Sequence, residues 1–168
     1  MKKFVFLLLM SLIVTSAANS QMSQFKALFL FNFAKNVNWP EHSGGSDFVI
    51  TVIGNDELAA ELKGLAKIRK INNSNLVIKE SQSAEDVTES HIIYLSATQS
   101  SLMPIIASYQ KGKPVLIVAD KQGLCSQGAG ISFFTSNGKL KFEVCPGNVE
   151  SHGLKMAQKL IALGSLVQ

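Results

Sequence analysis

The sequence of 168 residues has few of the groups on which enzymes and metalloproteins depend. It has two cysteines and three histidines, with neither the Cys-x-x-Cys nor the His-x-x-x-His spacing of metal ligands. It has no Gly-x-Ser-x-Gly motif of the kind found in hydrolases. The pair Gly128 and Gly130 lacks the third glycine and the following helix of a dinucleotide site. We therefore expect no enzymatic activity, no cofactor and no metal.

Charge is also scarce, and the chain has no long basic run. Two of the 16 basic residues, Lys2 and Lys3, belong to a leader-like N-terminus, which leaves 14 basic residues against 12 acidic ones. The densest basic cluster spans only residues 67–70. The sequence therefore lacks the basic clusters that are typical of nucleic-acid-binding proteins. After the leader, no apolar segment approaches the roughly 20 residues that a membrane-spanning helix needs.

The N-terminus has the pattern of a cleaved signal peptide. Two lysines precede the apolar segment Phe4–Val14, and Ala18 and Ser20 occupy the −3 and −1 positions of a cleavage site. An uncleaved anchor is the alternative, but this apolar segment is too short to span a bilayer. We expect a signal peptide at residues 1–20 and a mature, exported domain at residues 21–168.

Both cysteines, Cys125 and Cys145, lie in the mature part. In an oxidising compartment, an even number of cysteines favours one disulfide. Two unpaired thiols remain the alternative, because spacing alone does not establish that the two side chains meet.

The segment at residues 25–40 predicts the first helix of the mature domain. Phe29, Phe33 and Val37 repeat at a spacing of four residues and form a stripe for the core. Leu28 and Phe31 fall on other sides, so this helix is either buried nearly all round or offers a second face to a dimer or another partner. Proline at position 40 ends it.

Apolar strands then alternate with helical segments, which favours a parallel sheet with right-handed crossovers. The expected strands are residues 48–53, 76–78, 91–95 and 115–118, and the expected helices are residues 56–67, 98–110 and a short one at 83–87. A final helix is expected from about residue 149 to 167, with Leu154, Ala157, Leu160, Ile161 and Leu166 as core candidates.

Residues 131–144 form the strongest hairpin signal in the chain, because two alternating segments flank the turn dipeptide at residues 137–138. A two-residue turn places Phe133 opposite Phe142 and Cys145 opposite Gly130. A curled loop at residues 123–128 would then bring Cys125 to Cys145. The expected fold is a single-domain three-layer α/β/α sandwich with a mostly parallel sheet and a C-terminal antiparallel hairpin.

Two groups of surface residues are candidates for binding. Gly54, Ser96 and Asp120 follow parallel strands, at the edge where α/β folds bind small ligands; the alternative for Asp120 is a turn-capping role. A patch of Phe134, Glu143 and Val149 is the candidate for a partner surface, and the alternative is that Phe134 lies under a covering helix.

Several stretches, in order, resemble the YfiR-like family of exported bacterial proteins. They are the helix that ends in Trp39 and Pro40, the strand that ends at Gly54, and the segments at residues 91–96, 114–120, 125–131 and 141–144. The resemblance implies a periplasmic α/β protein without enzymatic activity. It also implies a repressor that binds the periplasmic part of an inner-membrane diguanylate cyclase or sensor kinase, and thereby controls cyclic-di-GMP or two-component signalling. The resemblance further implies a tendency to form homodimers, and relief of the repression by envelope or redox stress that is sensed partly through disulfides. A periplasmic small-molecule-binding module is the alternative function.

One departure from the family pattern concerns the cysteines. In members with a C-terminal disulfide, the second cysteine follows the first by seven residues. Cys125 matches the first position, but Ser132 occupies the second, and Cys145 falls where the family commonly has asparagine. A disulfide between Cys125 and Cys145 would therefore run across the hairpin instead.

Overall fold

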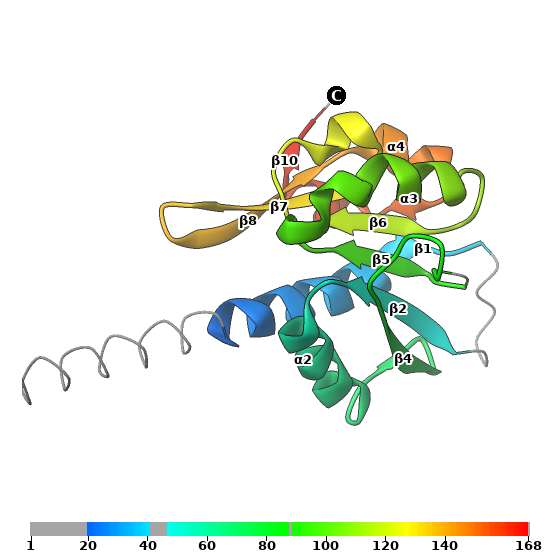
Figure 1. Ribbon diagram of the computed structural model, residues 1–168, viewed down its shortest axis with the longest axis vertical. Helices are drawn as coiled ribbons and strands as arrows, with labels where there is room; N and C mark the ends of the chain where they lie inside the picture. Colours follow the sequence, from blue (N-terminus) through cyan, green and yellow to red (C-terminus); the bar gives the residue numbers. More distant parts are fainter. Residues whose placement is uncertain (1–19, 41–46, 88, 168) are drawn as a thin grey trace, which may run out of the picture.

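A mostly parallel sheet of eight strands forms the middle layer of the molecule (Figure 1). The computed structural model describes residues 20–40, 47–87 and 89–167. Residues 1–19 of the predicted signal peptide lie outside these ranges. The strand order is β10-β8-β7-β6-β5-β2-β4-β3. The strands are β2 (Phe48–Ile53), β3 (Lys70–Ile71), β4 (Ser74–Ser81), β5 (Ile92–Leu95), β6 (Leu116–Ala119), β7 (Ile131–Ser136), β8 (Lys139–Val144) and β10 (Ser165–Leu166).

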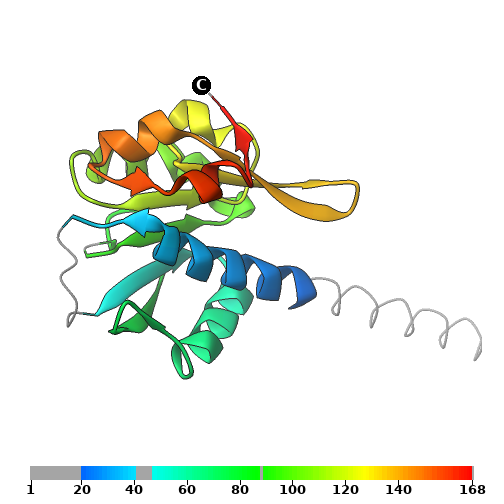
Figure 2. The ribbon, with the colours of Figure 1, turned by 180° about the vertical axis from the view of Figure 1, so that it is seen from behind.

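Helices cover both faces of this sheet, so the three-layer α/β/α sandwich is confirmed. One face carries the N-terminal helix, described over residues 20–36, together with α2 (Asp56–Ala66), α4 (Pro146–Ser151) and α5 (Gln158–Ile161). The other face carries the 3-10 helices η1 (Ala97–Leu102) and η2 (Leu124–Gln127) and the helix α3 (Met103–Tyr109). Figures 1 and 2 view the molecule from these opposite sides.

The N-terminal helix ends earlier than predicted, at residue 36 rather than near Pro40. Val37 and Asn38 leave the helix to form β1 (Val37–Asn38), which pairs antiparallel with β9 (Lys155–Met156). The indole N–H of Trp39 donates a hydrogen bond to the Ala34 carbonyl (2.9 Å) and closes the last turn. Backbone pairing with β9 therefore replaces the final helical turn, and Val37 stays buried as predicted.

The hairpin of β7 and β8 has the predicted register, with Phe133 opposite Phe142 and Ile131 opposite Val144. Its turn residues Asn137 and Gly138 have φ values of 52° and 70°. Two positive φ values are what a two-residue turn needs to match the twist of the strands. Phe133 and Phe142 pack against the N-terminal helix through Phe33, with ring centroids 5.7 and 5.2 Å apart.

The single C-terminal helix predicted over residues 149–167 is wrong. The chain forms α4, β9, α5 and β10 instead. Gly153 has a φ of +68°, which ends α4, and Gly164 packs closely against Phe142 where the chain enters β10. Leu154 and Leu160 are buried as predicted, whereas Leu166 is exposed.

Two further segments differ from prediction. The region at residues 83–87 is a turn rather than a helix, and the Ser83 hydroxyl donates to Asp86 (2.7 Å). The helix predicted at residues 98–110 begins as η1 and continues as α3, which has a proline in its first turn. Proline fits a first turn because it lacks an N–H that would be unpaired there.

Candidate functional site

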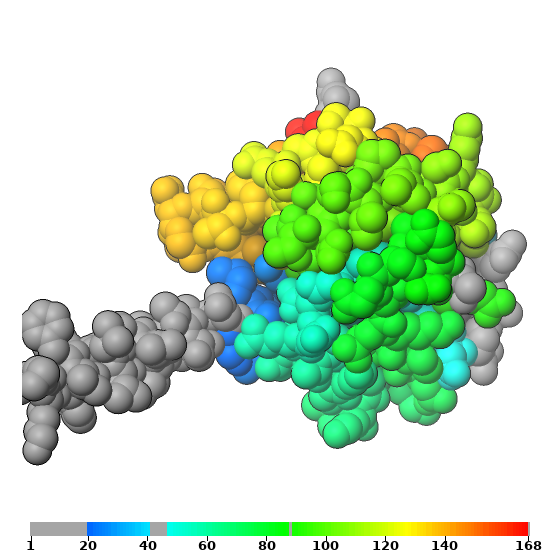
Figure 3. Space-filling model, viewed as in Figure 1, coloured from blue at the N-terminus to red at the C-terminus, as the bar shows by residue number. Residues whose placement is uncertain are grey.

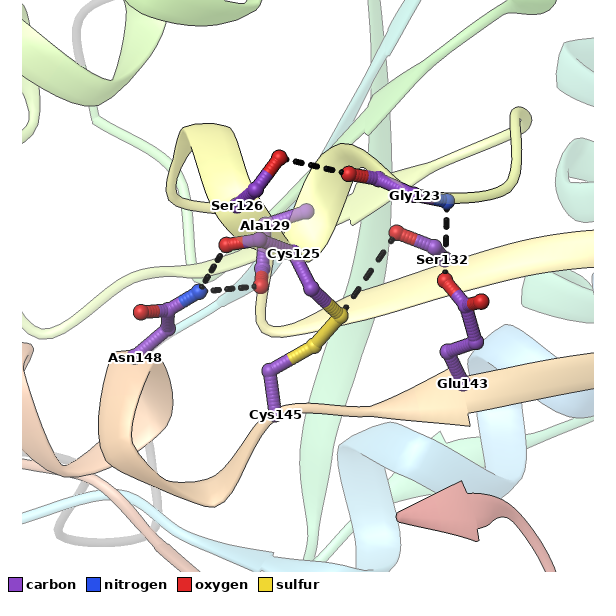
Figure 4. Close-up of a disulfide and its surroundings, with 8 residues drawn as sticks. All are labelled: Gly123, Cys125, Ser126, Ala129, Ser132, Glu143, Cys145 and Asn148. Atoms are coloured by element: carbon purple, nitrogen blue, oxygen red, sulfur yellow. Dashed lines mark hydrogen bonds between the residues drawn. A yellow bond between two sulfur atoms is a disulfide. The ribbon is translucent and has the colours of Figure 1, made fainter. Parts of the chain in front are cut away.

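A disulfide joins Cys125 to Cys145, in agreement with the predicted pairing, and the two Cα atoms lie 5.9 Å apart (Figure 4). Cys125 lies in η2, and Cys145 precedes the first residue of α4. Gly123 and Gly128 flank η2 with positive φ values, which let the loop curl back toward the end of β8. Both cysteines are buried.

Hydrogen bonds hold the same loop independently of the disulfide (Figure 4). The Asn148 amide donates to the carbonyls of Cys125 (2.7 Å) and Ala129 (2.8 Å). The Gly123 N–H donates to the Glu143 carboxylate (2.9 Å). The loop therefore has three polar anchors on β8 and α4 besides the covalent one.

Gly54, Ser96 and Asp120, the predicted ligand-binding residues, do lie together at the carboxyl edge of the sheet. The Ser96 N–H donates to the Ile53 carbonyl (3.1 Å), and the Asp120 N–H donates to the Leu95 carbonyl (2.8 Å). A Cβ at Gly54 would lie 2.7 Å from the Ser96 hydroxyl, so these two residues are in close contact. The Ser96 hydroxyl shares a hydrogen bond with Thr98 (2.9 Å).

Asp120 forms an ion pair with Lys26 of the N-terminal helix, with 2.6 Å between the ammonium nitrogen and a carboxylate oxygen. The two side chains are only 13% and 15% exposed. A carboxylate as buried as that of Asp120 needs a charged partner, and Lys26 provides it. This ion pair holds the N-terminal helix, at Lys26, against the carboxyl edge of the sheet. Thr98 thus occupies the Ser96 hydroxyl, Lys26 occupies the Asp120 carboxylate, and Gly54 is closely packed.

Tyr94 lies beside this ion pair, and its side chain is fully buried. Its hydroxyl has no hydrogen-bond partner within the described part of the chain. Burial raises the pKa of the Tyr94 phenol far above its usual range, and the nearby Asp120 carboxylate raises this pKa further. Tyr94 therefore stays neutral at physiological pH and is not poised as a nucleophile or base.

Three of the five predicted partner-binding residues are not available at the surface. Phe31 is 4% exposed, because it packs in the core with Arg69 5.4 Å from its ring centroid. Glu143 is turned to the Gly123 amide, and Val149 packs under the sheet in the larger core. The predicted patch of Phe134, Glu143 and Val149 is therefore wrong as an exposed surface; Phe134 itself is half-buried.

Leu28 does lie at the surface, where it is 40% exposed, and Phe25, one turn earlier, is 47% exposed. A groove of about 290 Å³ lies between the same N-terminal helix, β8, α5 and the segment after α5. We call it the helix–hairpin groove. It is lined by Phe29, Asn32, Phe33, Asn36, Phe142, Lys159, Leu160 and Leu163. Leu163 is 74% exposed at its rim.

Sequence reasoning missed Lys26, Tyr94 and Leu163 as site residues. Lys26 had a detectable signal, since it lies four residues before the buried Leu30, on the stripe that faces the core. A cation on a core stripe predicts a buried carboxylate. Leu163 has no such signal, because the sequence pattern predicts one long helix for the final segment.

No group of three metal-ligating side chains occurs within residues 20–40, 47–87 and 89–167. Over the same ranges, every helix is too short or too polar to cross a bilayer. The fold and these sites define a disulfide-containing α/β domain whose carboxyl edge is filled by its own side chains.

The family model described as YfiR/HmsC-like matches residues 23–165. The protein therefore belongs to the YfiR/HmsC-like family, which confirms the resemblance that the sequence suggested. Members of this family are periplasmic regulators of signalling and are not enzymes. A search of curated proteins found no match.

Proposed function

We propose that this protein is a periplasmic repressor that binds the periplasmic part of an inner-membrane diguanylate cyclase or sensor kinase and holds it inactive. Membership of the YfiR/HmsC-like family over residues 23–165 is the observation that carries this proposal. Repression would lower cyclic-di-GMP synthesis or kinase output, and stress would relieve it. We also propose that the protein acts as a homodimer, which light scattering of the purified protein would test.

The exposed apolar residues around the helix–hairpin groove support a protein partner. Phe25, Leu28 and Leu163 are 47%, 40% and 74% exposed and lie on two elements that border the groove. Apolar residues gathered around a groove are typical of docking surfaces for other proteins. We propose that this surface contacts the membrane partner.

The alternative function, a small-molecule-binding module, has less support from the contacts at the carboxyl edge. Lys26 neutralises Asp120, and Ser96 packs against Gly54. A ligand at this edge would have to displace the lysine of a largely buried ion pair. Thermal-shift screening with nucleotides, amino acids and sugars tests this alternative.

The test of the repressor uses a strain that lacks this gene. Cyclic-di-GMP and the output of candidate kinases are measured in this strain and after complementation. The wild-type chain is expected to lower one of these outputs and to co-purify with the corresponding membrane protein. The double variant Leu28→Glu and Leu163→Glu should lose both effects, because two carboxylates would be placed in an apolar contact.

Ile68→Glu provides the control, because Ile68 is 77% exposed and lies after α2, on neither of the two elements that carry Leu28 and Leu163. This variant should repress like the wild type. Unchanged cyclic-di-GMP and kinase outputs after deletion of the gene would contradict the proposed function. Full repression by the Leu28→Glu and Leu163→Glu variant would move the contact to another surface.

A further inference from the structure

Within the described residues, the outer half of the β7–β8 hairpin pairs with no third strand. β6 pairs with β7 at Ile131 and Ser132, and β10 pairs with β8 at Glu143 and Val144. Beyond these pairs, β7 and β8 continue to their turn with no further strand beside them in the described part of the chain. The hairpin consequently stands out from the body of the molecule (Figure 3). It has two open edges.

The direction of the backbone groups follows from the hydrogen bonds at the base of β8. The Val144 carbonyl accepts from the Val167 N–H (2.9 Å) on the outer side, whereas the Cys145 N–H donates to Gly130 (3.0 Å) on the inner side. Because this direction alternates along an antiparallel strand, Leu140 and Phe142 turn their N–H and C=O groups outward like Val144. Within the described part of the chain, Leu140 thus has no partner for its outward N–H and C=O groups, on the side of β8 where β10 pairs farther along.

We propose that the outer edge of β8 at Lys139–Phe142 binds an extended acidic and apolar segment of a partner protein as an added strand. This inference rests on the proposed function, since the segment would belong to the signalling partner. An added strand would place alternate side chains on the two faces of the hairpin. Each face has its own chemistry.

One face of the hairpin is apolar at this edge. Leu140 and Phe142 point to the side of the N-terminal helix, where Phe29 lies 5.5 Å from Phe142 between ring centroids. The helix–hairpin groove opens on this side, with Leu163 at its rim. Alternate residues of the added strand would therefore be apolar and would enter the groove.

The other face is cationic. Lys139 and Lys141 are exposed there, and the one carboxylate of the hairpin, Glu143, is turned to the Gly123 amide. Lysines on an open edge discourage pairing with arbitrary strands. They favour a strand that carries carboxylates opposite them, because opposite charges across strands attract.

The same lysines disfavour a second copy of this chain at this edge. Two β8 edges related by a two-fold axis would bring Lys139 and Lys141 of both copies onto one face. Like charges directly opposite each other destabilise a strand pair. The charge pattern therefore indicates an acidic segment from a different protein.

The test uses a short synthetic peptide that alternates leucine and glutamate, acetylated and amidated at its ends, added to the isotope-labelled mature protein. We expect saturable shifts of the Leu140 and Phe142 amide signals and slower hydrogen exchange at the Leu140 N–H. Leu140→Pro should weaken binding by about tenfold or more, because proline removes the outward donor. The ladder to β7 stays intact, since the Leu140 N–H does not take part in it.

Thr135→Pro is the matched control, because Thr135 opposes Leu140 in the same hairpin and turns its N–H to the other open edge. It should bind the peptide like the wild type. A peptide that alternates leucine and lysine should bind at least about tenfold more weakly, because its charges repel the hairpin lysines.

Absence of leucine–glutamate peptide binding at about 1 mM overturns the inference, and so does equal binding by the Leu140→Pro variant. A homodimer that Leu140→Pro dissolves would show that a second copy occupies the edge, which also overturns it. If Leu140→Pro still co-purifies with the membrane protein, this edge is excluded while the repressor function stands. Failure of the wild type to co-purify with any signalling protein counts against the function itself.

Discussion

Tyr94 gives the clearest residue-scale consequence of the filled carboxyl edge. Its phenol is fully buried and unpaired within the described residues, and burial next to Asp120 raises its pKa. In the unfolded chain, this pKa returns to an ordinary value of about 10. As the pH rises past about 10, the unfolded chain therefore loses this proton before the folded chain does, and the unfolded state gains stability.

We predict that Tyr94→Phe removes this alkaline loss of stability. The free energy of unfolding of the wild type should fall by up to about 1.4 kcal/mol per pH unit more than that of the variant above pH 10. At pH 7 the variant should be at least as stable as the wild type, because Tyr94→Phe removes a buried hydroxyl that has no hydrogen-bond partner within the described residues and therefore costs free energy in the folded state. Urea unfolding of both proteins from pH 7 to 11 provides the measurement.

Tyr109→Phe serves as the control for the loss of a phenol hydroxyl, since Tyr109 is 51% exposed. Parallel alkaline profiles for the wild type and Tyr94→Phe would contradict the assignment of this effect to Tyr94.

Which side of an element a single residue occupies was the least predictable feature. The position of Phe31 off the Phe29–Phe33 stripe predicts either a partner face or a helix buried nearly all round, and in the structure Arg69 and the core cover Phe31. Sequence periodicity identifies one buried stripe on the N-terminal helix. It does not indicate whether a neighbouring element such as α2 covers a second stripe of the same helix. Glu143 shows the same limit, because its partner is a backbone amide of a loop 20 residues away.

At the scale of elements, the hairpin was predictable because its information is local. The turn residues Asn137 and Gly138 set the loop length, and a period of two sets which side chains share a face. The parallel strands were predictable for a related reason, since continuous apolar runs are typical of covered sheets. None of these signals depends on distant parts of the chain.

The C-terminal segment was not predictable in the same way. Its apolar residues fit a helical period, but Gly153 needs a positive φ and Gly164 needs a close approach to β8. These glycines act through conformation and tertiary contact, so their role becomes visible only when β8 is in place. The pairing of β10 with β8 then replaces helical hydrogen bonds.

We predict that Gly164→Ala destabilises the protein by about 1–3 kcal/mol, as overpacking of a well-packed core does. A Cβ at this position would overlap the Val144 side chain and lie 2.7 Å from a ring carbon of Phe142. Val144 is fully buried, so it has little room to move. Urea denaturation at constant pH measures the effect.

Gly147→Ala is the matched control for this prediction. Gly147 lies in α4, and a Cβ there would meet no atom within 4 Å. This change should be neutral or stabilise the protein by up to about 1 kcal/mol, because alanine favours helix over glycine. Equal stabilities of the two alanine variants would contradict the close packing of Gly164.

At the scale of the whole molecule, the disulfide connects the two helical layers. Cys125 belongs to η2, whose Leu124 packs in the smaller core with α3. Cys145 precedes α4, whose Val149 packs in the larger core on the other face. The disulfide thus links the two helical layers beside the β7–β8 hairpin. A disulfide at the family's usual spacing would tie η2 only to the sheet.

The structure indicates that the disulfide partner of Cys125 can be changed from position 145 to position 132. The Ser132 hydroxyl lies 3.9 Å from the Cys125 sulfur, so the family's usual second position is adjacent to the first cysteine here. Ser132 is fully buried on β7, and its side chain points to the disulfide (Figure 4). We predict that the double variant Ser132→Cys and Cys145→Ser forms a disulfide between positions 125 and 132. Intact mass measured without reductant should show the loss of two hydrogens.

The free energy of unfolding should increase with the number of residues in the loop that the disulfide closes. The native loop separates its cysteines by 20 residues, which corresponds to about 3 kcal/mol in the chain-entropy model. The shorter loop of the double variant corresponds to about 2 kcal/mol, so the variant should be less stable than the oxidised wild type by about 1 kcal/mol. Cys145→Ser alone should be the least stable of the three, while the Asn148 and Glu143 hydrogen bonds keep its loop in place. Two alkylatable thiols in the double variant would contradict the predicted adjacency. In that case positions 125 and 132 do not come close enough in solution for a disulfide to form between them.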